Sequence, residues 1–129
     1  MSGRGILVVD DERDIREVLQ TALEMEGYQV YTAANGKEAL ALLEREPGLQ
    51  LVLLDLMMPV MNGLEFLGTV RRDPRLHDLP VVVVSAFGQM VRDGALQALG
   101  PQGFMEKPVQ FQALLDVVSR HCGPPPSGG

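Results

Sequence analysis

Three short runs of purely apolar residues constrain the fold of this chain more than any other feature. They cover Ile6–Val9, Leu51–Leu54 and Val81–Val84, and each is followed at once by a polar side chain. A strand that is apolar at every position is typical of a parallel sheet with helices packed on both faces, because a strand with one wet face alternates between apolar and polar residues. The runs therefore indicate an α/β fold.

Amphipathic stretches separate these runs and predict helices. Apolar residues recur at helical spacing over Glu12–Met25, over two stretches that begin after Asn35 and after Asn62-Gly63, over Gln89–Leu99, and in a last stretch from Phe111. Shorter strands are expected at Gln29–Ala33 and Gly103–Met105. Five β-α units joined by right-handed crossovers predict a doubly wound, five-stranded parallel sheet in the order 2-1-3-4-5, with helices on both faces.

Composition limits the classes of function. The 129 residues suit one domain, and the net charge of −6 argues against binding to nucleic acid, whose phosphates need Lys and Arg. No apolar run approaches the roughly 20 residues of a membrane span. The single cysteine, Cys122, cannot form a disulfide within the chain and favours a reducing compartment. We therefore expect a cytoplasmic domain over residues 1–122, followed by a disordered tail or linker at 123–129.

Charged and hydroxyl side chains follow the expected strands at their carboxyl ends. Asp10 and Asp11 follow the first apolar run, Asp55 the second and Ser85 the third, and Lys107 follows the last short strand. In a doubly wound sheet these ends form the edge where ligands bind. Three carboxylates that meet there stay ionised only beside a cation. Oxygen donors without His or Cys favour Mg²⁺ over zinc.

The same residue types are the parts needed for phosphoryl transfer. A carboxylate at Asp55 can act as the nucleophile, Lys107 can neutralise a phosphoryl oxygen, and Ser85 can donate a hydrogen bond. Taken singly, each position has an ordinary explanation, because Asp11 can cap a helix and Lys107 can be a solvated surface lysine. Their coincidence at one edge of the sheet favours a site.

Four motifs in this chain resemble the receiver domains of bacterial response regulators, the family that includes the chemotaxis regulator. The motifs are Val8–Glu12, Leu53–Gly63, Val84–Ala86 and Phe104–Pro108, and the resemblance extends from about Gly5 to His121. It implies a flavodoxin-like fold and a switch domain of a two-component system that accepts a phosphoryl group.

The resemblance also implies how the acidic residues bind the metal. Asp55 is the expected phosphoacceptor. Asp11 and Asp55 are the expected direct ligands of Mg²⁺, the backbone carbonyl of Met57 is the third, and Asp10 holds the ion through water.

A second set of roles follows from the same resemblance. Lys107 and Ser85 are expected to contact the phosphoryl group, and the Lys107–Pro108 bond is expected to be cis. Ser85 and Phe104 are the expected switch, and Phe104, which lacks the hydroxyl of the tyrosine often found at this position, would act by packing alone. Phosphorylation would remodel the face formed by the expected helix at 89–99, the strand at 103–105 and the final helix.

The expected partners follow from this role. A sensor histidine kinase or a histidine phosphotransferase supplies the phosphoryl group, and an unknown output protein binds the remodelled face. A homodimer that forms on phosphorylation stays open, as does the oligomeric state. The domain is not expected to be an enzyme in the metabolic sense, although it catalyses its own phosphorylation and dephosphorylation. We expect dephosphorylation to be slow, because the apolar Met57 and Phe87 occupy positions that flank the hydrolytic water in the family.

Three alternatives stay open at this point. A phosphatase of the haloacid dehalogenase type uses similar groups, but it wants a second acid two residues after the nucleophile, where this chain has Met57. A degenerate receiver would act purely as a protein-binding module, and the complete set of acids and lysine disfavours it. The chain is also either a stand-alone receiver or part of a larger protein such as a hybrid kinase.

Overall fold

The structure is a computed structural model that describes residues 5–46, 48–56, 60–85 and 100–123. The expected helix over 89–99 lies outside the described residues, as do Met57, Phe87 and the tail at 124–129. The elements in chain order are β1 (Gly5–Val9), α1 (Arg13–Met25), β2 (Gln29–Ala33), α2 (Gly36–Arg45), β3 (Leu49–Leu54), α3 (Gly63–Arg72), β4 (Val81–Ser85), β5 (Gly103–Glu106) and α6 (Phe111–Cys122).

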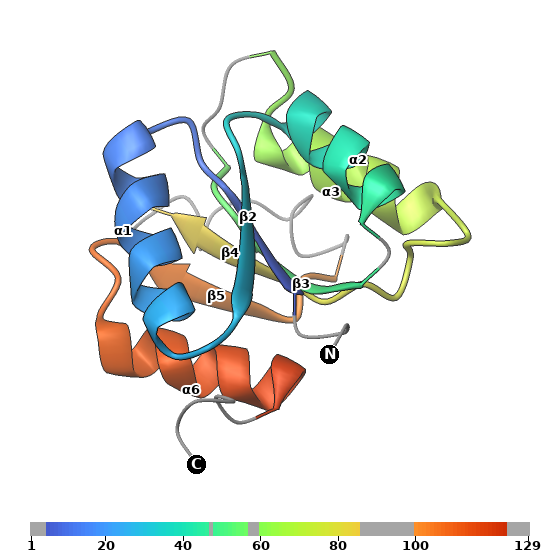
Figure 1. The fold of residues 1–129 in the computed structure, drawn as a ribbon. Coiled ribbons are helices and arrows are strands. Elements are labelled where there is room, and N and C mark those ends of the chain that lie inside the picture. Colours follow the sequence, from blue (N-terminus) through green and yellow to red (C-terminus); the bar gives the residue numbers. More distant parts are fainter. Residues whose placement is uncertain (1–4, 47, 57–59, 86–99, 124–129) are drawn as a thin grey trace.

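The five strands form one parallel sheet in the order β2-β1-β3-β4-β5, which confirms the predicted fold class. Helices α1 and α6 lie on one face of the sheet, and α2 and α3 lie on the other (Figure 1). The order places β1 and β3 side by side at the centre, so the residues that follow these two strands are neighbours in space.

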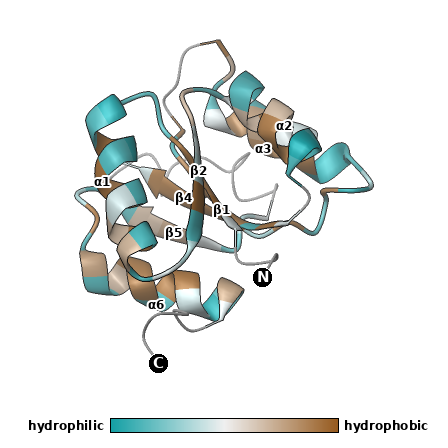
Figure 2. Ribbon diagram, in the orientation of Figure 1, coloured by the Kyte–Doolittle hydropathy of each residue, from teal (hydrophilic) through white to brown (hydrophobic). Residues whose placement is uncertain are grey.

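Alternation within the central strands explains why they are apolar throughout. Ile6 and Val8 of β1 pack in the core beneath α1 and α6, whereas Leu7 and Val9 pack in the core beneath α2 and α3. Successive side chains of a strand point to opposite faces, so a strand with helices packed on both faces of its sheet is buried and apolar at every position. In Figure 2 apolar colour marks β4, whereas polar colour is frequent on the visible surfaces of α1 and α2.

Two of the four described helices, α2 and α3, begin with a side-chain cap, whereas α1 and α6 do not. The side chains of Asn35 and Asn62 cap α2 and α3 by accepting hydrogen bonds from the third residue inside each helix. Helix α1 instead has Glu12 at its N-cap position, without a side-chain cap bond. Asp11 is therefore not the N-cap residue of α1, and the ordinary explanation of Asp11 as a helix cap does not hold.

Strand β3 begins two residues earlier than the apolar run suggested. Gly5 pairs with Leu49 and Ile6 pairs with Leu51, so the register shifts at Gln50. The shift accommodates an exposed polar residue that interrupts the apolar pattern, and the sequence pattern therefore placed the start of the strand too late.

None of the helices in the described part of the chain is long and apolar enough to cross a membrane.

Candidate functional site

Backbone hydrogen bonds fix the acidic and basic residues at the carboxyl edge of the sheet. The amide of Asp10 donates to the Ala33 carbonyl at 3.1 Å, and the amide of Asp55 donates to the Val9 carbonyl at 2.9 Å. Between β4 and β5, the amide of Lys107 donates to the Ser85 carbonyl at 2.9 Å. The sheet pairing thus continues just past the strands, and it fixes the backbones of Asp10, Asp55 and Lys107 relative to the core.

Three carboxylates meet at this edge. Each of Asp10, Asp11 and Asp55 offers one oxygen, and these oxygens lie within 4.8 Å of one another. Asp10 and Asp55 are buried, and Asp11 is exposed. Negative charges this close repel strongly in a partly buried setting, so the arrangement favours a bound cation. A set of carboxylate oxygens with one side open to water suits the hard, hydrated Mg²⁺ ion.

Lys107 completes the site from the loop between β5 and α6. Its ammonium nitrogen Nζ lies 2.9 Å from Asp10 Oδ2 and 3.6 Å from Asp55 Oδ1, and its side chain is only 20% exposed. Burial lowers the pKa of Lys107, but the hydrogen bond that Lys107 donates to Asp10 and the charges of Asp10, Asp55 and Glu12 outweigh it, so the pKa is raised on balance. Lys107 therefore stays charged at neutral pH and is not a solvated surface lysine.

Asp10 accepts hydrogen bonds through both carboxylate oxygens and through its backbone carbonyl. Its Oδ1 accepts a hydrogen bond from the Glu12 amide at 2.9 Å, and its Oδ2 accepts the bond from Lys107. Its backbone carbonyl accepts a hydrogen bond from Nη1 of Arg16 at 2.7 Å. The sequence does not indicate this role for Arg16, since an arginine in the second turn of a helix carries no signal that it turns back to the preceding loop.

Ser85 and Phe104 differ in their surroundings. Ser85 ends β4 and is buried beside the site, and in the sheet it pairs with Glu106 of β5. Phe104 pairs with Val83 and is 42% exposed, so it is not a core residue. The cis form of the Lys107–Pro108 bond, which the resemblance implied, is present.

Gly63 is a second residue whose contribution to the site is not apparent from the sequence. It begins α3, and its amide donates to the Leu56 carbonyl at 3.1 Å. A Cβ atom on Gly63 would lie 2.4 Å from the Asp55 carbonyl oxygen and 2.8 Å from Leu56 Cα. Only glycine lets the helix approach the Asp55 backbone this closely. In the sequence, the Asn62-Gly63 pair indicates only where a helix begins, and that signal does not reveal the packing.

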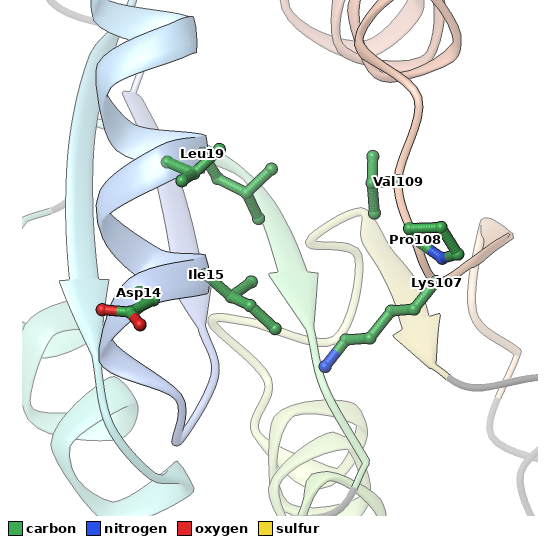
Figure 3. Close-up of a pocket in the computed structure, with 7 residues that line it drawn as sticks. Asp14, Ile15, Leu19, Lys107, Pro108 and Val109 are labelled. Atoms are coloured by element: carbon green, nitrogen blue, oxygen red, sulfur yellow. The ribbon is translucent and has the colours of Figure 1, made fainter.

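An apolar groove runs beside the site. Its lining includes Ile15, Val18 and Leu19 of α1 and Pro108 and Val109 after β5. In Figure 3 Ile15 points across the groove toward the Lys107 side chain, whereas Asp14 points away. Val18 is 66% exposed, so this part of the surface is apolar and accessible to another protein.

Comparison with known proteins identifies the class. Residues 6–119 match the response regulator receiver domain family. An uncharacterised 14.6 kDa protein of Leptolyngbya boryana is 40% identical over 91% of this chain and 88% of its own length. The phosphate regulon transcriptional regulatory protein PhoB of Pseudomonas aeruginosa is 38% identical over 96% of this chain, but over 55% of its own length.

The solved structures agree with this family. Chemotaxis protein CheY4 of Vibrio cholerae has a TM-score of 0.83 and 32% identity, covering 91% of this chain and 97% of that chain. A response regulator receiver protein of Pseudomonas putida has a TM-score of 0.86 and 30% identity, covering 94% and 99%. The chain belongs to the response regulator receiver domain family of two-component signalling. It spans about half of the length of several transcriptional regulators that it matches.

Proposed function

We propose that this domain accepts a phosphoryl group from a phosphohistidine onto Asp55 in a reaction that depends on Mg²⁺. The observation that carries the proposal is the position of the Lys107 ammonium, 3.6 Å from the Asp55 carboxylate and beside a cluster of three acids. A nucleophilic carboxylate, a cation site and a fixed ammonium group at one sheet edge supply what in-line phosphoryl transfer needs.

The reaction moves one phosphoryl group between two side chains. An Asp55 oxygen attacks phosphorus, the P–N bond of the phosphohistidine breaks, and the imidazole nitrogen leaves with the electron pair and takes up a proton. Lys107 neutralises charge on the phosphoryl oxygens, and Ser85 donates a hydrogen bond to one of them. Asp11 and Asp55 would hold Mg²⁺ directly and Asp10 would hold it through water. When bound, the ion offsets negative charge during transfer.

The proposed phosphodonor is a sensor histidine kinase or a histidine phosphotransferase. A protein that presents a histidine to Asp55 must lie over the edge of the sheet, and the apolar groove between α1 and Pro108 borders that edge. Val18→Arg should therefore slow labelling by phosphorylated kinases in a panel of purified histidine kinases and leave labelling by phosphoramidate unchanged. Equal kinase rates for Val18→Arg and wild type would rule out this docking surface.

We further propose that phosphorylation shifts a pre-existing equilibrium at the face that includes β5 and α6. The buried Ser85 lies next to the site, and the half-exposed Phe104 lies on the adjacent strand where its ring can change packing. The remodelled face would bind an output protein. Beryllofluoride with Mg²⁺ tests the switch, because a module that only binds proteins should show no change in the amide spectrum of Phe104.

Slow loss of the phosphoryl group is a third part of the proposal. It rests on the apolar residues Met57 and Phe87, neither of which can orient a water for hydrolysis. Replacing Met57→Asn should shorten the lifetime of the phosphorylated domain. A wild-type rate of phosphate loss equal to or faster than that of the variant would refute this part.

The central experiment is labelling with acetyl phosphate, followed by intact mass. Wild type with Mg²⁺ should gain one phosphoryl group, and hydroxylamine should remove it because the product is an acyl phosphate. Asp55→Asn and chelation by EDTA should both abolish labelling. Asp78→Asn, at an exposed loop aspartate, is the matched control and should label normally. Labelling that survives Asp55→Asn would overturn the proposal.

A further inference from the structure

Arg16 makes a contact that links α1 to the acidic end of β1. This half-buried side chain donates from Nη1 to the Asp10 carbonyl at 2.7 Å, a short distance of the kind formed by charged donors. Arg13 lies on the same helix, yet it pairs at 2.9 Å with Glu17 in solvent. The two arginines therefore carry the same charge on the same helix, and only Arg16 bonds to the loop that carries the acids.

The Asp10 carbonyl controls the next residue through peptide geometry. Its oxygen belongs to the planar peptide unit that also contains the Asp11 nitrogen and Cα. A bond that fixes this oxygen fixes the plane, and with it the direction of the Asp11 N–Cα bond, from whose Cα the side chain leaves the backbone. Asp10 has independent anchors in Glu12 and Lys107, whereas Asp11 is exposed and gains little from packing.

We propose that Arg16 is a positioning residue for the cation site, which it serves by orienting the Asp10–Asp11 peptide so that the Asp11 carboxylate faces Asp55. This proposal rests on the proposed Mg²⁺ site. Removing a residue that orients a metal ligand commonly weakens metal affinity by about 10- to 100-fold. Arg16 reaches the ligand through a backbone carbonyl, so we expect an effect of about tenfold.

The test compares three variants of the whole chain by calorimetric titration with Mg²⁺. Arg16→Gln should raise the Kd about tenfold, and Arg13→Gln, which removes the same charge, should change it less than about twofold. Arg16→Lys keeps the charge but loses the planar, longer donor, and it should raise the Kd at least about fivefold. Equal effects of Arg16→Gln and Arg13→Gln would reduce the role to long-range charge and overturn the proposal. A wild-type Kd in Arg16→Lys would do the same, even if Arg16→Gln does not fold.

A second measurement needs no metal and separates this proposal from the proposed function. In the amide spectrum of the metal-free protein, the Asp11 resonance should shift in Arg16→Gln and Arg16→Lys and stay in place in Arg13→Gln. An unmoved Asp11 amide in both Arg16 variants would contradict the positioning role. If the wild type binds no Mg²⁺, the cation site itself is overturned, and the proposed role of Arg16 falls with it. If the wild type binds Mg²⁺ and the Arg16 variants bind it equally well, only the proposed role of Arg16 is overturned.

Discussion

Replacing Gly63 with alanine tests how closely α3 must pack against the backbone of the phosphoacceptor. The added methyl carbon would lie 2.4 Å from the Asp55 carbonyl oxygen and 2.8 Å from Leu56 Cα, and real Cβ atoms essentially never come within 3.0 Å of a heavy atom outside their own residue and its two chain neighbours. Both contacts are backbone, so neither can swing aside as a side chain could. The first turn of α3 must retreat by more than half an ångström, or the Asp55 peptide must shift.

The magnitude follows from two opposing effects. Overpacking of this kind costs about 1–3 kcal/mol. The higher helix propensity of alanine offsets part of that, by less than about 1 kcal/mol at the first residue of a helix. We expect a net loss of about 1–2 kcal/mol in the free energy of unfolding, which for a domain of this length lowers the Tm by about 4–8 °C. Labelling of Asp55 by acetyl phosphate should also slow, because the shifted peptide carries the nucleophile.

The assay is urea unfolding followed by far-ultraviolet circular dichroism, because the chain has no tryptophan. Gly103→Ala is the matched control. A Cβ atom on Gly103 would lie 3.7 Å and 3.9 Å from the two methyl carbons of Val82, which is ordinary contact. This variant should be neutral or more stable by up to about 1 kcal/mol. A Gly63→Ala protein that is as stable as wild type would refute the argument from close approach.

Three further predictions concern single contacts and the cation. Tyr28→Phe removes the 2.8 Å hydrogen bond that the hydroxyl of the buried Tyr28 donates to the Gly123 carbonyl. It should lower the free energy of unfolding by about 1 kcal/mol and speed hydrogen exchange in the last turn of α6, and unchanged exchange would contradict this expectation. Asn62→Ala breaks a capping box with Glu65 and should cost about 1 kcal/mol in urea unfolding, whereas an unchanged midpoint would show that the cap contributes nothing. Mg²⁺ at about 100 times its Kd should raise the free energy of unfolding by about 2.7 kcal/mol in wild type. The same Mg²⁺ gain in Asp11→Asn would argue that the ion binds elsewhere.

The sheet could be predicted from the sequence because its signal is local. Each central strand is a run of apolar residues, each run is closed by a polar residue, and the crossover rules leave few orders of strands. The convergence of Asp10, Asp55 and Lys107 follows from that topology alone, although the first and the last are 97 positions apart in the chain. Their roles in phosphoryl transfer stay predictions until the labelling experiment is done.

Contacts that depend on side-chain reach could not be predicted in the same way. The hydrogen bond from Tyr28 to Gly123 joins residues 95 positions apart, and the sequence around either residue does not predict it. Arg16 and Arg13 are equivalent in a pattern of charge along α1, yet one turns to the loop and the other to solvent. The register shift at Gln50 is similar, because a polar residue inside an apolar run is equally compatible with a later strand start.

The way the site is assembled decides how its variants must be interpreted. Its charged groups follow three different strands, and Asp10, Asp55 and Lys107 are each held by a backbone hydrogen bond that continues the sheet pairing. A change that loosens the sheet will therefore separate Asp55 from Lys107 and lower labelling without touching the chemistry. A positioning effect, such as that proposed for Arg16, differs because it should alter the Mg²⁺ affinity of a protein that is still fully folded. Each titration should therefore be run well below the Tm of the least stable variant, where a difference in Kd reports the geometry of the acids rather than the population of folded molecules.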